Sequence, residues 1–377
     1  MSLRVALITE IIAPYRIPVF NALARFRELN LHVIFLAETD PTQREWLVYK
    51  DEIEFSFEVL PSWRRRSQLG HVLINRGMQA ALNRFVPQSI ICGGYNHIAL
   101  WEALAWARMH KARFSTWIES TKRDSRSNGP MREFLKRRFL EQCDSFVVPG
   151  QSSFEYVRFL GFPAQQIFTA PNAVDIQRFG RLAGQARSRA PEIRAQLGLP
   201  EKYFLFVGRL IEHKGIFQLL EAYSLLDSGT RSQFGLVYVG DGDTGHSLLQ
   251  KAEGLQPGAV QVRGFLQRDQ LAEFYALAYA FVFPTLSDPW GLVVNEAMAC
   301  GLPVIATDVA GCTVDLVREG ENGIVVPAAD ARKLAAAMAT LASDPAQASR
   351  MAERGATLIE GFTPEKCATG LAGAAGI

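Results

Sequence analysis

Cysteine is scarce in this chain of 377 residues, which has five cysteines, no Cys-x-x-Cys pair and no Cys/His group at metal-ligand spacing. Structural zinc sites and thiol redox motifs need such spacings, and isolated thiols behave as small apolar residues in a reducing compartment. We therefore expect neither a disulfide framework nor a bound metal. The cysteines are Cys92, Cys143, Cys300, Cys312 and Cys367.

Long apolar runs are also missing. No run approaches the roughly 20 residues that a membrane-spanning helix needs. Near the N-terminus, Glu10 interrupts what would be the apolar core of a signal peptide. We expect a cytoplasmic protein, or one that binds peripherally at the inner face of a membrane.

Net charge is low, because 40 Lys and Arg face 38 Asp and Glu. We expect no nucleic-acid partner. The distribution is uneven, however, since residues 1–180 carry 23 basic against 17 acidic residues. Basic residues gather at 63–66 and over 122–138, where Lys136, Arg137 and Arg138 lie among apolar residues. Such a stretch is either a solvated helix face or a surface that docks on anionic lipid headgroups.

The length exceeds what one hydrophobic core usually supports, so two domains are expected. Apolar runs suited to buried strands alternate with helical patterns over residues 1–170, and this alternation resumes over 201–360. It predicts two doubly wound, Rossmann-like domains with parallel sheets. Residues 171–200 are predicted to be an interdomain linker, and 361–377 a C-terminal segment that crosses back to the first domain.

The stretch from residue 284 to 307 places two acids around a predicted helix. Asp288 followed by Pro289 favours a helix start near Trp290, and the helix should end at Gly301. Glu296 lies eight positions after Asp288, so two carboxylates flank a helix N-terminus, which attracts anions. Either acid taken alone could be a simple cap or a solvated residue.

A glycine-rich loop follows the first predicted strand of the second domain. It begins at Gly208 and ends at Gly215, and it contains Arg209 and Lys214. Glycine lets a backbone approach a phosphate closely, and two cations can neutralise a diphosphate. The loop is not a Walker motif, because no G-x-x-x-x-G-K-[ST] occurs. As isolated residues it could be an ordinary turn.

Taken together, these stretches resemble the retaining GT-B glycosyltransferases of the group 1, family 4 type. That family has two glutamates separated by seven residues around a Gly-Phe-Gly-like loop. The spacing is kept in this chain, but Asp288 replaces the first glutamate and Pro-Trp-Gly replaces the loop. The string G-R-L-x-x-x-K-G from Gly208 matches the family's diphosphate-gripping motif. Further short matches lie at 171–175, 239–242 and 264–266.

The resemblance implies roles for the matching residues. Arg209 and Lys214 would neutralise the leaving diphosphate, Asp288 would hold the transferred sugar, and Glu296 would hold the ribose. The other residues implied to bind the nucleotide-sugar are Gly208, Gly240, Phe265, Leu266, Trp290, Gly291 and Leu292.

The first domain departs from the family pattern, since its first strand-to-helix loop lacks the usual glycine pair. This loop offers Glu10, Tyr15 and Arg16, which we assign to the acceptor side. His97 falls where the family carries a histidine facing the donor sugar, although a lone histidine at a helix start is often structural. Glu119 could orient an acceptor hydroxyl, or could merely pair with Lys122 or Arg123.

The implied function is transfer of a sugar from a UDP- or GDP-sugar to a hydroxyl, with retention of configuration and without a cofactor or metal. The one D-x-D match, at 241–243, lies in a glycine turn. The acceptor is expected to be a glycan or a lipid-linked intermediate of surface polysaccharide synthesis. Two alternatives stay open: a nucleotide-sugar epimerase of the same fold, and a non-catalytic sugar-nucleotide-binding protein.

Overall fold

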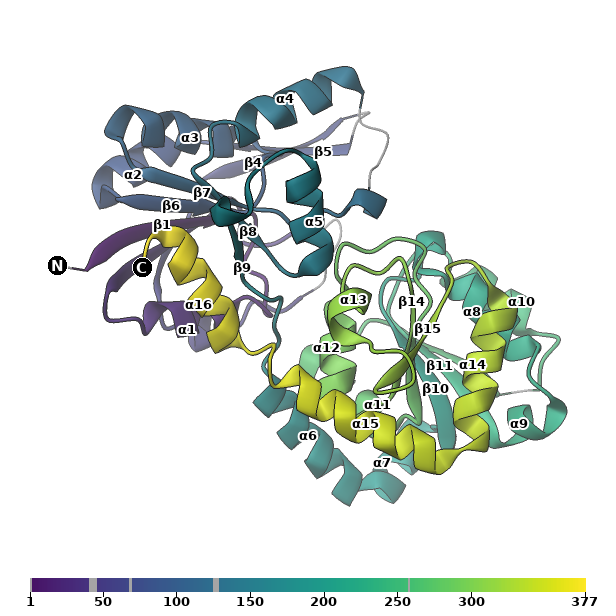
Figure 1. Cartoon of the computed structure of the whole chain (residues 1–377). Coiled ribbons are helices and arrows are strands. Elements are labelled where there is room, and N and C mark those ends of the chain that lie inside the picture. The colour runs from purple at the N-terminus through teal and green to yellow at the C-terminus, as the bar shows by residue number, and fades with distance from the viewer. Residues whose placement is uncertain (1, 41–45, 68–69, 125–128, 257) are drawn as a thin grey trace. The chain divides into compact units, whose positions relative to one another are not determined.

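A computed structural model describes residues 2–40, 46–67, 70–124, 129–256 and 258–377. The chain forms two compact units (Figure 1). Unit 1 combines Met1–Ala173 with Thr363–Ile377, and unit 2 is Val174–Phe362. The C-terminal segment therefore folds with the first unit.

Unit 1 is built around a seven-stranded parallel sheet with the order β3-β2-β1-β6-β7-β8-β9. Its strands are nearly continuous apolar runs because helices cover both faces, and β6 and β8 are buried along their whole length. The strands are β1 Leu3–Thr9, β2 Leu29–Phe35, β3 Ser56–Val59, β6 Ser89–Cys92, β7 Arg113–Trp117, β8 Ser145–Val148 and β9 Ile167–Thr169. A separate antiparallel pair is formed by β4 Ser62–Ser67 and β5 Gly70–Asn75.

Helices pack on the two faces of this sheet and enclose two apolar clusters. One cluster lies around Trp106, Phe114 and Phe139, and the other includes Phe20 and Phe35. The helices of unit 1 are α1 Ile17–Ala24, α2 Met78–Phe85, α3 Ile98–His110, α4 Pro130–Leu140, α5 Gln151–Phe159 and α16 Pro364–Ala375, with 3-10 turns η1 Lys50–Glu52, η2 Lys122–Asp124 and η3 Ala164–Gln166.

Unit 2 has a six-stranded parallel sheet with the order β12-β11-β10-β13-β14-β15. In terms of its own strands this is the order 3-2-1-4-5-6 of a doubly wound Rossmann sheet. The strands are β10 Lys202–Val207, β11 Phe234–Val239, β12 Val260–Arg263, β13 Ala280–Phe283, β14 Val304–Thr307 and β15 Gly323–Val326.

The helices of unit 2 enclose one apolar cluster on each side of the sheet. They are α6 Ile176–Ser188, α7 Ala190–Leu197, α8 Ile216–Ser224, α9 Ser228–Gln233, α10 Gly245–Ala252, α11 Arg268–Leu277, α12 Leu292–Ala299, α13 Thr313–Leu316, α14 Ala331–Ser343 and α15 Pro345–Ile359, with a 3-10 turn η4 Glu212–Lys214. Residues 174–200, which we assigned to a linker, form part of unit 2 through α6 and α7.

The helix expected to begin near Trp290 begins two residues later, at Leu292. Its N-cap is Gly291, whose φ of 101° belongs to the left-handed region that favours glycine. Asp288 is therefore not the cap, and instead its Oδ1 accepts a hydrogen bond from the Trp290 backbone N–H at 3.1 Å. Helix α2 begins only at Met78, after β5 and a short turn.

Helix α16 is held on the sheet of unit 1 beside α1 (Figure 1). The carbonyl of Ala374 accepts hydrogen bonds from Arg113 at 2.7 Å and from the hydroxyls of Ser115 at 3.2 Å and Ser145 at 3.4 Å. A Cβ built on Gly370 would lie 2.2 Å from the carbonyl oxygen of Thr169. This close approach is possible only because Gly370 has no side chain.

We predict opposite effects for two helical glycines replaced by alanine. Gly370→Ala should lower the unfolding midpoint of the protein, with a cost of about 1–3 kcal/mol, because the new methyl group overpacks the α16 contact. Gly184→Ala in α6 should raise stability by about 0.5–1 kcal/mol, because that glycine is exposed and nothing lies within 4 Å of its Cβ position. Chemical denaturation followed by circular dichroism measures both. An unchanged midpoint for Gly370→Ala would contradict the packing of α16.

Candidate functional site

The strand order of unit 2 reverses between the neighbouring strands β10 and β13. In open α/β sheets, ligands bind outside the carboxyl ends of the strands at such a switch point. The loops that follow these two strands touch through their backbones, since the Leu286 N–H donates to the His213 carbonyl at 2.9 Å. A Cβ on Gly215 would lie 1.8 Å from the Pro284 carbonyl oxygen, so this position requires glycine.

Two of the predicted site residues meet at this switch point. Lys214 ends the turn η4 after β10, and Asp288 lies in the loop after β13. The Lys214 ammonium forms an ion pair with the Asp288 carboxylate, and their side chains are only 15% and 14% exposed. A mostly buried ion pair is costly to separate, because each charge then loses its partner in a medium of low dielectric constant. The pair therefore holds both side chains at the edge of the sheet.

The predicted glycine turns also come together, at the ends of β10, β11 and β12. The Gly208 N–H donates to the Val239 carbonyl at 3.0 Å, and the Gly240 N–H donates to the Gly264 carbonyl at 2.9 Å. A Cβ on Gly240 would lie 1.9 Å from the Gly208 carbonyl oxygen. Phe265 and Leu266 follow Gly264 directly and are half-buried.

A series of buried threonine hydroxyls joins three of these loops. Thr313 donates to the Thr307 carbonyl at 2.8 Å, and Thr307 donates to the Thr285 carbonyl at 2.6 Å. Thr285 in turn donates to the His213 carbonyl at 3.3 Å. This threonine ladder fixes the loops after β14, β13 and β10 relative to one another. Sequence reasoning missed it, although Thr285 and Thr307 lie at the ends of two predicted strands.

Trp290 lies between the two acids but does not present its ring to a ligand. The indole is 3% exposed, and its Nε1 donates to the Asn295 side chain at 2.9 Å within the core. Any contact of Trp290 with a ligand must therefore involve its backbone. Gly291 and Leu292 follow at the start of α12, which has no side-chain cap. A helix start of this kind presents backbone N–H groups to an anion.

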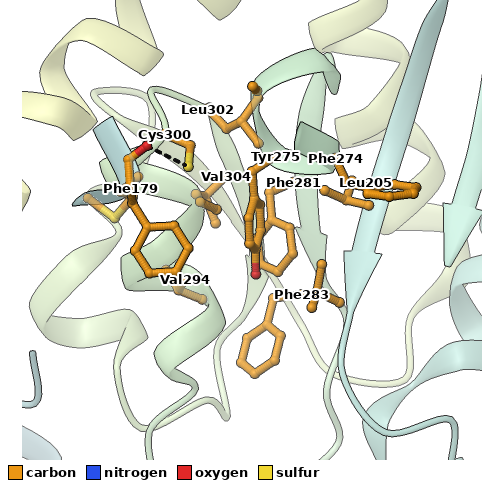
Figure 2. Packing of buried hydrophobic residues seen from close by; sticks show 14 of the residues in the cluster. Phe179, Leu205, Phe274, Tyr275, Phe281, Phe283, Val294, Cys300, Leu302 and Val304 are labelled. Atoms are coloured by element: carbon orange, nitrogen blue, oxygen red, sulfur yellow. Dashed lines mark hydrogen bonds between the residues drawn. The ribbon is translucent and has the colours of Figure 1, made fainter. Parts of the chain in front are cut away.

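Glu296 lies one turn into α12 and is half-buried. Its carboxylate accepts a hydrogen bond from the Tyr275 hydroxyl at 2.8 Å. Tyr275 packs beside Phe281, with ring centroids 5.7 Å apart (Figure 2). Burial raises the pKa of Glu296 to about 7, and the Tyr275 hydrogen bond opposes that rise only in part. Tyr275 is a second residue that sequence reasoning missed, because it lies on a different helix.

In unit 1, Glu10 and His97 follow β1 and β6, the two strands between which that sheet reverses its order. His97 Nε2 lies 3.6 Å from Glu10 Oε2, and the imidazole is 17% exposed. The neighbouring His97 imidazole holds the pKa of the Glu10 carboxyl below its usual value. The structure thus brings together two residues that the sequence placed far apart.

Arg16 forms an ion pair with Glu119, also in unit 1. The Arg16 guanidinium lies over the Trp117 ring, 3.9 Å from its centroid, and it is 13% exposed. Asn172 donates to the same Glu119 oxygen at 3.4 Å. Glu119 therefore pairs with Arg16, and not with Lys122 or Arg123 as the sequence also allowed. Tyr15 packs edge-on against Trp46 at 5.6 Å.

Among the described residues, no three His, Cys, Asp or Glu side chains gather in a way that could hold a metal ion. All five cysteines are free and buried. Within the same described ranges, none of the helices combines the length and the apolar character that crossing a membrane requires.

Residues 190–357 match the model of the glycosyl transferases group 1 family. This part of the chain is a group 1 glycosyl transferase domain. It contains the whole switch-point constellation of unit 2, from Gly208 to the threonine ladder.

Curated glycosyltransferases match the chain over part of its length. A D-inositol 3-phosphate glycosyltransferase of Streptomyces bingchenggensis is 33% identical over 229 residues, which cover 58% of this chain and 49% of the relative. The O-antigen chain mannosyltransferase B of Escherichia coli is 26% identical over 244 residues, or 63% of this chain and 62% of the relative. The chain thus spans about half to three fifths of these relatives' lengths.

Solved structures resemble the chain along nearly its full length. Anabaena HepE (Alr3699) in complex with UDP has a TM-score of 0.76 at 18% identity, covering 98% of this chain and 99% of that one. The lipopolysaccharide outer core galactosyltransferase WaaB has a TM-score of 0.71 at 16% identity, covering 99% of each chain. The predicted fold class, GT-B with two Rossmann-like units, is confirmed.

We predict that Glu296 makes the stability of the glycosyl transferase domain depend on pH. Because the pKa is raised in the folded protein, the protonated carboxyl stabilises the fold fully below about pH 4.5, and this contribution is lost as the pH rises through about 7. Relative to Glu296→Gln, the wild type should therefore lose on the order of 1 kcal/mol between pH 5 and 8. Urea denaturation across this pH range measures the difference.

Glu221 is exposed in the same unit, so the variant Glu221→Gln serves as a control for the loss of one negative charge. Tyr275→Phe should extend the pH dependence to higher pH, because it removes the hydrogen bond that favours the carboxylate. A constant difference between wild type and Glu296→Gln at every pH would contradict the buried setting of this carboxyl.

Proposed function

We propose that the protein is a retaining glycosyltransferase that moves a sugar from a nucleoside-diphosphate sugar, a UDP- or GDP-sugar, to a hydroxyl acceptor. The observation that carries the proposal is the Lys214–Asp288 ion pair at the switch point of unit 2, beside closely packed glycine turns. The family match over 190–357 supports it, and so does UDP in the structure of Anabaena HepE.

The donor would bind to unit 2. Lys214 and Arg209 would carry the positive charge that a diphosphate needs, while Gly208 and Gly240 let the backbone come close to it. Glu296 would bind a ribose hydroxyl, and its raised pKa would let the carboxyl donate as well as accept a hydrogen bond near neutral pH. Phe265 and Leu266 would border the base.

In the proposed reaction, the bond between the anomeric carbon and the diphosphate oxygen breaks, and a bond to the acceptor oxygen forms on the same face of the sugar. The acceptor proton passes to the departing phosphate oxygen, so no protein carboxylate becomes covalently attached. Lys214, Arg209 and the N–H groups at the start of α12 stabilise the negative charge that develops on the diphosphate. The proposal requires no bound metal.

The acceptor side is assigned to unit 1, where Glu10 lies beside His97 and Arg16 forms an ion pair with Glu119. These groups can bind sugar hydroxyls by charge-assisted hydrogen bonds. A glycan or a lipid-linked intermediate of surface polysaccharide synthesis is the proposed acceptor. Support comes from the relative that is an O-antigen chain mannosyltransferase and from the neighbour that is a lipopolysaccharide galactosyltransferase.

We predict that Lys214→Gln weakens binding of UDP or GDP by about 10–100-fold, because a cation–diphosphate contact is lost. The substitution also leaves Asp288 mostly buried without its partner, so the protein should lose on the order of 3 kcal/mol of stability. Titration calorimetry with UDP, GDP and ADP should therefore be done below the unfolding range of the variant. Lys333→Gln, an exposed lysine of α14, is the matched control.

The substitution Asp288→Asn should have the opposite effect on the affinity for the nucleotide. Removing the carboxylate frees the ammonium of Lys214, so UDP or GDP alone should bind about 3–10-fold more tightly. Transfer of the sugar should nevertheless fall by at least about 100-fold, because the proposed contact with the sugar is lost. Parallel calorimetry and turnover measurements separate the two effects.

Three outcomes would overturn the assignment in different ways. If none of the three nucleotides bound the wild type, the donor site itself would be wrong. Interconversion of the donor sugar without any acceptor would indicate an epimerase. Nucleotide-sugar binding that gives neither transfer nor donor hydrolysis with a range of glycan and lipid-linked acceptors would indicate a binding protein.

A further inference from the structure

Helix α4 exposes large apolar side chains on the side opposite its packed face. Met131, Phe134 and Leu135 are 69%, 61% and 46% exposed. Their spacing of three and four positions places them on one face of the helix, together with Arg138. We call these four residues the α4 outer face. Apolar side chains grouped on one exposed helix face form a candidate interaction surface, whereas exposed apolar residues that are scattered singly need no explanation.

The inner face of α4 is held firmly in unit 1. Phe139 and Leu140 are buried in the apolar cluster around β7 and β8. Lys136 is also buried, pairs with Glu133 at 2.5 Å and donates to the Tyr156 hydroxyl at 3.0 Å. The sequence grouped Lys136 with the cations that would meet lipid headgroups, and that grouping is wrong, because Lys136 anchors the helix from within.

The cations that remain are on the outside and surround the apolar residues. Arg138 continues the outer face about one turn beyond Leu135, and the helical period places Arg132 and Arg137 on either side of that face. Arg137 is 79% exposed and lies 3.0 Å from Glu141. With Lys136, the helix carries four basic residues against Glu133 and Glu141, so its net charge is positive. Residues 125–128, which precede the helix, lie outside the described residues.

The size of this surface distinguishes between two possible binding partners, a second copy of the chain and a membrane. An eleven-residue helix is about 16 Å long, so its outer face offers on the order of 200 Å². A stable dimer needs about 800 Å² from each partner, which this face alone does not supply. Membrane docking needs less, because apolar side chains enter the headgroup region individually and arginines add attraction to anionic lipids.

We propose that the α4 outer face docks on the surface of an anionic membrane, with Met131, Phe134 and Leu135 entering the headgroup region and Arg132 and Arg138 contacting lipid phosphates. This inference goes beyond the proposed transfer reaction and does not depend on it. It requires no rearrangement of the protein, because all five side chains are already exposed.

Co-sedimentation of the full chain with vesicles tests the proposal. The wild type should bind vesicles of phosphatidylcholine mixed with phosphatidylglycerol, and binding should fall with added salt because the lipid charge is screened. A triple variant should partition onto the vesicles more weakly than the wild type by about tenfold or more. It combines Met131→Ser, Phe134→Ser and Leu135→Ser. The double variant Arg132→Gln with Arg138→Gln should bind anionic vesicles more weakly, and its binding should depend less on salt than that of the wild type.

A matched control carries three serines at equally exposed apolar positions elsewhere, Met109, Leu225 and Leu249, which are 68%, 51% and 43% exposed. It should bind vesicles like the wild type, and all variants should keep the wild-type affinity for UDP or GDP. Wild-type protein that stays in solution with both vesicle types would overturn the proposal. A dimer of the wild type in light scattering would also overturn the proposal if the triple variant of Met131, Phe134 and Leu135 were a monomer and the control variant were not. The α4 outer face would then bind a second copy of the chain.

Discussion

The ion pair between Lys214 and Asp288 is the interaction on which the candidate site depends. Two charges that are only about one seventh exposed need each other, because neither is fully solvated by water. The loops that carry them are fixed independently, by the contact of Gly215 with Pro284 and by the threonine ladder. The charges are thus placed by a rigid frame before any ligand binds, which is the condition under which fixed charges stabilise a reaction best.

Unit 1 repeats this arrangement with different residues. Its sheet also reverses order between two neighbouring strands, and Glu10 and His97 follow those strands as a second acid–base pair. In both units a basic group and an acidic group lie side by side at the switch point, within their own unit. A charged ligand that binds there must take over one member of a pair, so its binding energy is reduced by the interaction that it replaces. Discrimination between ligands then depends on how well each one replaces the lost partner.

The sequence predicted the two parallel sheets well, because strands such as Ser89–Cys92 and Ser145–Val148 are apolar runs that are buried on both faces. It also predicted the loops that carry Lys214 and Asp288. It could not predict that Asp288 caps no helix, because this depends on the left-handed backbone of Gly291 and on the pairing with Lys214. Contacts between distant positions, such as Tyr275 with Glu296, leave no local pattern and appear only once the helices are packed.

The two acids of the second unit lie eight positions apart in the sequence, but they are in different chemical environments. Asp288 faces an ammonium group and a backbone N–H, so its shorter side chain is tied to its own loop. Glu296 faces a tyrosine hydroxyl among aromatic rings, and burial moves its pKa to about 7. Two carboxyls whose surroundings differ in this way are suited to different tasks. Under the proposed function, the aspartate would exchange its cation partner with an incoming diphosphate, whereas the glutamate would bind a neutral hydroxyl without bringing a full negative charge near that diphosphate.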